Sequence, residues 1–106
     1  MSDKNQPQEI DLFEAANAHL NAGRYQEAIQ TYESLLQTSP ETASSPELQN
    51  NLGLALFHLG RLEEAIHGFR TALKLMPNFA IAESNLGLAL LNLKRFEEAI
   101  APLQSA

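Results

Sequence analysis

The chain has 106 residues, of which 44% are hydrophobic and 19% charged, which is the composition of one small folded domain. Its 13 acidic and 7 basic residues give a formal net charge of -6, and the basic residues are scattered, so neither nucleic acid nor an anionic membrane surface is an expected partner. The absence of cysteine excludes disulfides, thiolate catalysis and thiolate metal sites.

Residues 1–8 form a polar leader without periodic apolar residues, which predicts a disordered segment. No apolar run approaches the length of a membrane span, and the leader does not resemble a signal peptide. A cytoplasmic location is therefore expected.

From residue 9 onward the apolar residues recur at spacings of three and four, which predicts helices. Leu12 and Ala16 belong to a first helix, and Ala28 and Tyr32 belong to a second. Gly23 lies between them, where a left-handed residue would end the first helix. The two helices are expected to form a hairpin.

A second hairpin follows, with helices over residues 46–59 and 62–75 joined by a turn at Gly60-Arg61. Ser45 is the predicted N-cap of its first helix, because its hydroxyl can accept from a free amide. A third hairpin is predicted from residues 80–92 and from residue 96 to the end, with a kink or an early end at Pro102.

The hairpins are copies of one sequence unit. The hexapeptide at residues 51–56, Asn-Leu-Gly-Leu-Ala-Leu, recurs 34 residues later at residues 85–90, and 13 of the 27 aligned pairs in these two units are identical. A fixed period of this length is typical of stacked helical repeats. The first unit is offset by 37 residues from the second, which predicts an enlarged loop at residues 41–45.

The repeated unit resembles the tetratricopeptide repeat, a 34-residue helix-turn-helix. The matching positions carry small residues where two backbones approach and large residues around them. In the second unit they are Leu52, Gly53, Ala65, Phe69, Ala72 and Pro77, in the third Leu86, Gly87, Ala99 and Ala106, and in the first Ala28, Tyr32 and Pro40. We therefore expect an all-α solenoid over residues 9–106, with repeat 1 at 9–42, repeat 2 at 46–79 and an incomplete repeat 3 at 80–106.

The resemblance implies a right-handed superhelix in which the first helix of each unit lines a concave groove that binds a partner. Helical register assigns ten residues to this predicted groove: Phe13, Asn17, Leu20, Asn50, Leu54, Phe57, His58, Leu88, Leu91 and Asn92. An apolar stripe beside amides suits an amphipathic helix or an extended peptide.

Family members that hold the acidic tails of heat-shock chaperones use a set of Lys, Arg and Asn residues in this groove. The matching positions here are Phe13, Asn17, Leu54, Ile81 and Asn85, and only Asn17 agrees. Because the cations are missing, we expect an apolar or basic partner rather than an acidic one.

Nothing in the sequence indicates an enzyme, a cofactor or a metal site. His19, His58 and His67 lie on three different predicted helices without ligand spacing, and no convergent nucleophile accompanies them. The chain is expected to be a non-enzymatic scaffold for protein interaction.

An alternative follows from the third unit, which lacks a polar capping helix. Phe96, Ile100 and Leu103 would then be partly uncovered. The chain is accordingly expected to be a piece of a longer protein, which could itself be an enzyme, or to form a homo-oligomer through this C-terminal face.

Overall fold

The computed structural model describes residues 8–105, with side chains described for residues 12–97. Residues 1–7 of the predicted leader, Ala106 and the side chains of Ile100 and Leu103 lie outside the described part. That part contains helices and no strand, as an all-α solenoid requires. They are α1 (Gln8–Asn21), α2 (Tyr25–Thr38), the short 3-10 helix η2 (Pro40–Ser44), α3 (Pro46–His58), α4 (Leu62–Leu75) and α5 (Ala80–Ser105).

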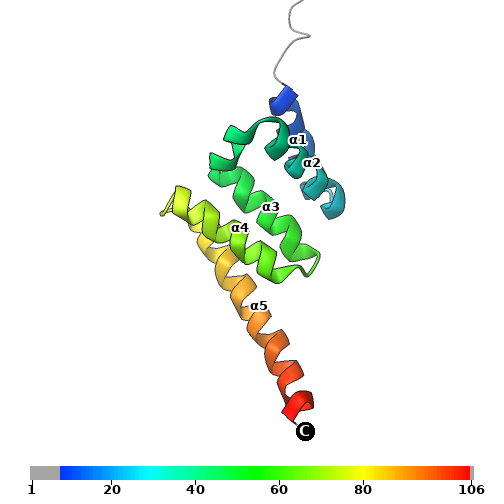
Figure 1. Ribbon diagram of the computed structural model, residues 1–106, viewed down its shortest axis with the longest axis vertical. Coiled ribbons are helices and arrows are strands. Elements are labelled where there is room, and N and C mark those ends of the chain that lie inside the picture. Colours follow the sequence, from blue (N-terminus) through cyan, green and yellow to red (C-terminus); the bar gives the residue numbers. More distant parts are fainter. Residues whose placement is uncertain (1–7, 106) are drawn as a thin grey trace, which may run out of the picture.

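The helices pack as successive antiparallel pairs (Figure 1). α1 packs against α2 and α3 against α4, while α2 contacts α3 and α4 contacts α5. Each hairpin thus buries its apolar faces against the next, which is the expected behaviour of a stacked repeat.

Both hairpin turns depend on a glycine. Gly23 and Gly60 each have φ +80, the left-handed conformation that residues with a Cβ disfavour. This conformation lets the following amide bond back into the helix: Arg24 N–H donates to His19 O at 2.8 Å, and Arg61 N–H donates to Leu56 O at 2.9 Å. The predicted turns are confirmed.

The link between the first two units is ordered by local hydrogen bonds. Ser45 Oγ accepts from the amide of Leu48 at 3.1 Å, which confirms it as the N-cap of α3. The predicted enlarged loop contains η2, in which Thr42 N–H donates to Ser39 O at 2.8 Å. The additional residues therefore form a compact turn of helix.

The tightest helix contact lies between α3 and α4. A Cβ built on Gly53 would lie 2.8 Å from the ring of Phe69 and 3.1 Å from the carbonyl oxygen of Ala65. Ala65 and Phe69 are fully buried. Glycine is required at position 53 because any larger residue would push the helices apart.

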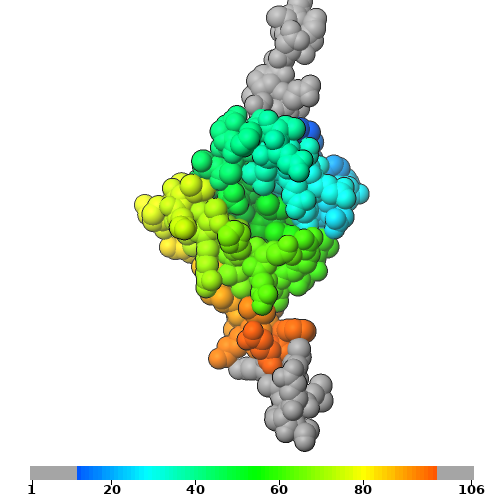
Figure 2. All heavy atoms as spheres, in the orientation of Figure 1, coloured from blue at the N-terminus to red at the C-terminus, as the bar shows by residue number. Residues whose placement is uncertain are grey.

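The third unit differs from the prediction. Residues 80–105 form the single helix α5, without the turn expected between residues 92 and 96, and α5 continues through Pro102 instead of ending early. The reason lies in the turn residue: the position of Gly60 is taken by Lys94 in the repeat, and lysine avoids the left-handed conformation that the turn needs. The helix therefore continues. In Figure 2 the later part of α5, drawn in orange, projects beyond the packed hairpins.

Candidate binding surface

The first helices of the three units, α1, α3 and α5, are joined by side-chain amides. We call Phe13, Asn17, Leu20, Asn50, Leu54, Phe57, His58, Leu88, Leu91 and Asn92 the first-helix surface. Spacings of three and four residues place the members from each helix on one face of that helix. Contacts from α1 to α3 and from α3 to α5 bring the three helices together.

An asparagine network runs across the three helices. Asn17 Oδ1 accepts from the hydroxyl of Tyr32 and from Asn51 Nδ2, the latter at 3.1 Å. Asn50 Nδ2 donates to Asn51 Oδ1 at 3.4 Å, and Asn50 Oδ1 accepts from Asn85 Nδ2 at 3.0 Å. The network links α1 to α3 and α3 to α5, so it holds the units in register.

This network changes the role of one predicted site residue. Asn50 is only 3% exposed, so it lies inside the stack and its amide is engaged by Asn51 and Asn85. Asn51 and Asn85, which carry much of the network, are not among the ten residues of the predicted groove. Their recurrence at the repeat period was the available signal.

Burial also affects Tyr32, whose hydroxyl belongs to the network. Its side chain is fully buried, and this burial raises the pKa of Tyr32 to about 12, with the amide of Asn51 partly opposing the rise. The hydroxyl is consequently a neutral donor at ordinary pH. Because this hydroxyl and Asn51 both donate to Asn17 Oδ1, that oxygen is less available to accept a hydrogen bond from a partner.

Aromatic contacts order the first-helix surface at α1 and α3. The rings of Phe13 and Tyr32 lie 6.3 Å apart, and Phe57 meets His58 edge to face at 5.6 Å. His58 in turn stacks on Tyr25 of α2 at 4.5 Å. Phe13 and Phe57 are half-buried and pack against the core, so only part of each side chain is open to a partner.

Exposure of the apolar side chains is greatest on α5. Leu20 and Leu54 are half-buried against the core, whereas Leu88 is 51% and Leu91 46% exposed. Asn92 donates to the Leu88 carbonyl of its own helix at 2.9 Å, which leaves its side-chain oxygen for other contacts. The structure therefore offers a partner more apolar area at α5 than at α1.

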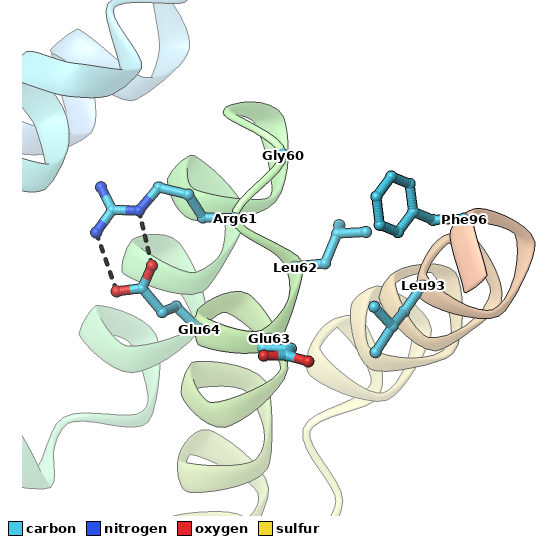
Figure 3. A pocket seen from close by; sticks show the side chains of 7 residues that line it. All are labelled: Gly60, Arg61, Leu62, Glu63, Glu64, Leu93 and Phe96. Carbon is cyan, nitrogen blue, oxygen red and sulfur yellow. Dashed lines mark hydrogen bonds and ion pairs between the residues drawn. The ribbon is translucent and has the colours of Figure 1, made fainter. Parts of the chain in front are cut away.

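A separate recess of about 290 Å³ lies where α4 begins and α5 passes (Figure 3). Leu62, Leu93 and Phe96 supply its apolar part. Arg61 points away from these side chains and pairs with Glu64 through two bonds of 2.7 and 2.9 Å. The hydrogen bonds of this pair raise the pKa of Arg61 and lower that of Glu64.

A second recess, of about 310 Å³, lies between α2, α3 and α4 and has an acidic wall of Glu33, Glu63 and Glu64 beside His67. Within the described residues, no three histidine or acidic side chains gather in a way that could hold a metal ion. His19 Nδ1 instead accepts from Arg24 Nε at 2.9 Å. Of the helices described, none combines the length and hydropathy needed to cross a bilayer.

Comparison with sequence families agrees with the arrangement of the helices. A family model described as tetratricopeptide repeat matches residues 13–69, and one described as TPR repeat matches residues 53–94. None of the curated proteins compared with the chain matches it.

Several solved structures are similar in fold. One mutant form of MamA has a TM-score of 0.75 at 23% identity, with 95% of this chain and 72% of that chain covered. A second MamA mutant has a TM-score of 0.73 at 23% identity, with 97% of this chain covered, and this chain spans only 54% of its length. At these identities the likeness shows the fold alone.

The first TPR of Spaghetti (RPAP3), bound to the HSP90 peptide SRMEEVD, has a TM-score of 0.72 at 30% identity, with 86% of this chain and 70% of that chain covered. The second TPR of the same protein, bound to the same peptide, has a TM-score of 0.73 at 22% identity, with 97% and 93% covered.

Proposed function

Since the chain belongs to the tetratricopeptide repeat family, we propose that it is a protein-interaction module that binds a peptide or an amphipathic helix of a partner on the first-helix surface. The observation that carries this proposal is the pair of exposed leucines on α5, Leu88 and Leu91, which occupy the repeat positions of the half-buried Leu54 and Phe57 of α3. Leu88 and Leu91 are three residues apart and so share one helix face, and exposed apolar side chains grouped in this way are typical of docking surfaces. The proposed function needs no cofactor, metal or catalytic residue.

The two solved TPR units of RPAP3 are bound to a peptide, which supports a peptide as the class of partner. That peptide, SRMEEVD, is acidic. The first-helix surface of this chain contains neither lysine nor arginine, and the whole chain carries a net charge of -6. An acidic segment would therefore meet repulsion without charge-assisted hydrogen bonds, so we propose an apolar or basic partner segment.

The apolar contacts would come from α3 and α5 together. Leu54 and Phe57 pack against the core, so their positions are set before a partner arrives. Leu88 and Leu91 bring most of the area that binding would remove from water. A preordered apolar surface lowers the entropy lost on binding.

Leu91→Glu tests the proposal. Peptides would be selected from a displayed random library against the wild-type chain, and their dissociation constants measured by fluorescence anisotropy. We expect Leu91→Glu to weaken them at least ~10-fold, because a charge placed in an apolar contact must be desolvated. Phe57→Glu should abolish binding, and circular dichroism must show that its helices persist, since Phe57 also packs against the core.

Leu75→Glu is the matched control. Leu75 is an exposed leucine at the end of α4, away from the first-helix surface, so this variant should bind the selected peptides as the wild type does. Peptides that bind Leu91→Glu at full affinity, or that lose affinity only for Leu75→Glu, would move the binding site to another surface.

A second candidate is self-association through α5. It is favoured by Phe96, which is 58% exposed at the recess between the start of α4 and α5 (Figure 3). An exposed aromatic side chain next to Leu62 and Leu93 is an apolar surface that a second copy of the chain could cover.

A further inference from the structure

One face of α5 is open to solvent, although the equivalent face of α3 in the preceding unit is covered by another helix. Leu90 and Leu56 occupy the same repeat position, yet Leu56 is 5% exposed and Leu90 39%. The contrast at the glycines is larger. A Cβ on Gly53 would collide with Phe69, whereas a Cβ on Gly87 would meet nothing within 4 Å.

The chain itself carries the segment that matches this open face. In the second unit, α4 covers Gly53, and its first turns read Glu63-Glu64-Ala65-Ile66. The same four residues recur as Glu97-Glu98-Ala99-Ile100 in the second half of α5. The repeat therefore places the counterpart of this covering helix on the same continuous helix, with Pro102 and Leu103 at the positions of Gly68 and Phe69.

A continuous helix cannot fold back on itself. Closing the hairpin within one chain would place Lys94 in the left-handed conformation that Gly23 and Gly60 adopt at φ +80. A side chain makes this conformation unfavourable. A second copy of the chain can supply the missing helix without any such turn.

We propose that two copies of the chain exchange the second halves of α5, so that residues 96–105 of each copy cover Gly87 and Leu90 of the other. The exchange builds two contacts of the α3–α4 kind at once, one at each end of an antiparallel pair of α5 helices. It rests on the self-association candidate above and specifies its geometry. Exchange of an identical element is a low-cost route to a dimer when a hinge cannot close.

The repeat fixes where the two helices would cross. Gly53 meets Ala65 and Phe69, so the α3–α4 pair is centred on the turn at Gly60 and Arg61. The same register in α5 is centred on Lys94, and the two-fold axis would pass near this residue in both copies.

Phe96 then lies within one helical turn of the axis, where the second copy would cover its exposed ring. Lys94 of both copies would lie beside the axis, and Glu97 of the second copy would lie within one helical turn of Lys94. The recess formed by Leu62, Leu93 and Phe96 would close at the same time.

Sedimentation velocity of the full chain over a range of concentrations tests the exchange. We expect a monomer–dimer equilibrium for the wild type. Lys94→Ala keeps α5 continuous and should keep the dimer. Lys94→Gly permits the left-handed turn in both copies, so the dimer dissociation constant should rise about 10- to 100-fold.

Gly87→Leu provides an independent variant. In the single chain its side chain enters open space, so circular dichroism should show undiminished helix content. In the exchanged dimer it would collide with the incoming helix, as a side chain on Gly53 would collide with Phe69. The variant should therefore be a folded monomer.

The lack of cysteine allows a direct geometric readout. A spin label would be attached at Glu83→Cys, an exposed position on α5. The two labels of a dimer should lie about 35 Å apart, because each is separated from the two-fold axis by the helical rise between residues 83 and 94, and the two helix axes are themselves about 8–10 Å apart. A strictly monomeric wild type would overturn both self-association and the exchange. A dimer that Lys94→Gly and Gly87→Leu leave unchanged would overturn the exchange alone, because the copies would then meet through another face.

Discussion

Gly53 and Gly87 are the same residue at the same repeat position, and they have opposite physical roles. Gly53 permits α4 to approach, since the carbonyl oxygen of Ala65 and the ring of Phe69 occupy the space that a Cβ would need. Gly87 faces open space in the single chain. The contribution of a glycine to stability therefore depends on what packs against it rather than on the local sequence.

This difference predicts opposite effects of one substitution. Gly53→Ala should lower the free energy of unfolding by about 1–3 kcal/mol, because the added methyl group overpacks the α3–α4 contact. Gly87→Ala should raise it by about 0.5–1 kcal/mol, because alanine is the better helix former. Urea unfolding at a protein concentration low enough to keep the chain monomeric measures both.

The wild type is the reference for both variants. Equal effects of the two substitutions would contradict the open environment of Gly87, and with it the arrangement of α5 as one continuous helix.

At the scale of the helices, two devices determine how the units are joined. The left-handed glycines Gly23 and Gly60 end α1 and α3 and return the chain into a hairpin. The asparagine network then sets the register of α1, α3 and α5. Where the glycine is replaced by Lys94, the second helix of the unit joins the first.

Asn50→Ala tests the asparagine network. Removing the buried Asn50 side chain leaves Asn85 Nδ2 without its acceptor between α3 and α5. We expect the free energy of unfolding to fall by about 1–3 kcal/mol, because a partly buried hydrogen-bond network loses its central member. Chemical denaturation followed by circular dichroism gives the value.

Asn92→Ala is its control, since the Asn92 amide bonds within its own helix and is not shared between helices. A change within about 0.5 kcal/mol is expected there. If Asn50→Ala were as mild as Asn92→Ala, the network would not contribute to the packing of the units.

For the whole molecule, we propose that charge and apolar area together select the class of partner. The net charge is -6, and the first-helix surface lacks basic residues, while Leu88 and Leu91 are exposed on it. Long-range repulsion and the absence of paired cations act together against an anionic segment.

The acidic peptide SRMEEVD therefore should not bind this chain. We expect no saturable change in the anisotropy of the labelled peptide up to about 1 mM chain. This range would reveal any complex with a dissociation constant below about 1 mM, which corresponds to a binding free energy of about 4 kcal/mol. The first TPR of RPAP3, whose solved structure holds this peptide, is the positive control. Micromolar binding to this chain would refute the proposed exclusion of acidic partners.

Much of the architecture could be predicted from the repeat alone. The repeat period, the helical spacing of apolar residues and the turn glycines predict α1 to α4, the cap at Ser45 and the family. These features are local, and local physics decides them: a helix needs a periodic apolar face, and a turn needs a residue that tolerates positive φ.

The candidate binding surface was only partly accessible to this reasoning. Asn50 was assigned to the predicted groove by helical register, but register does not show that Asn85 of another helix lies beside it. The ten predicted positions stay a prediction for partner binding. Their different exposure, from the buried Asn50 to the open Leu88, became clear only from the packing of the helices.

The sequence by itself determined the period, the helix class and the identity of the hairpin contacts, because each is encoded within a single unit. Only the tertiary structure decided the state of the third unit. There Lys94 stands in place of a turn glycine, α5 continues, and Gly87 and Leu90 stay uncovered. The physical reason is that burial is a property of neighbours: identical residues are core or surface according to which helix packs against them.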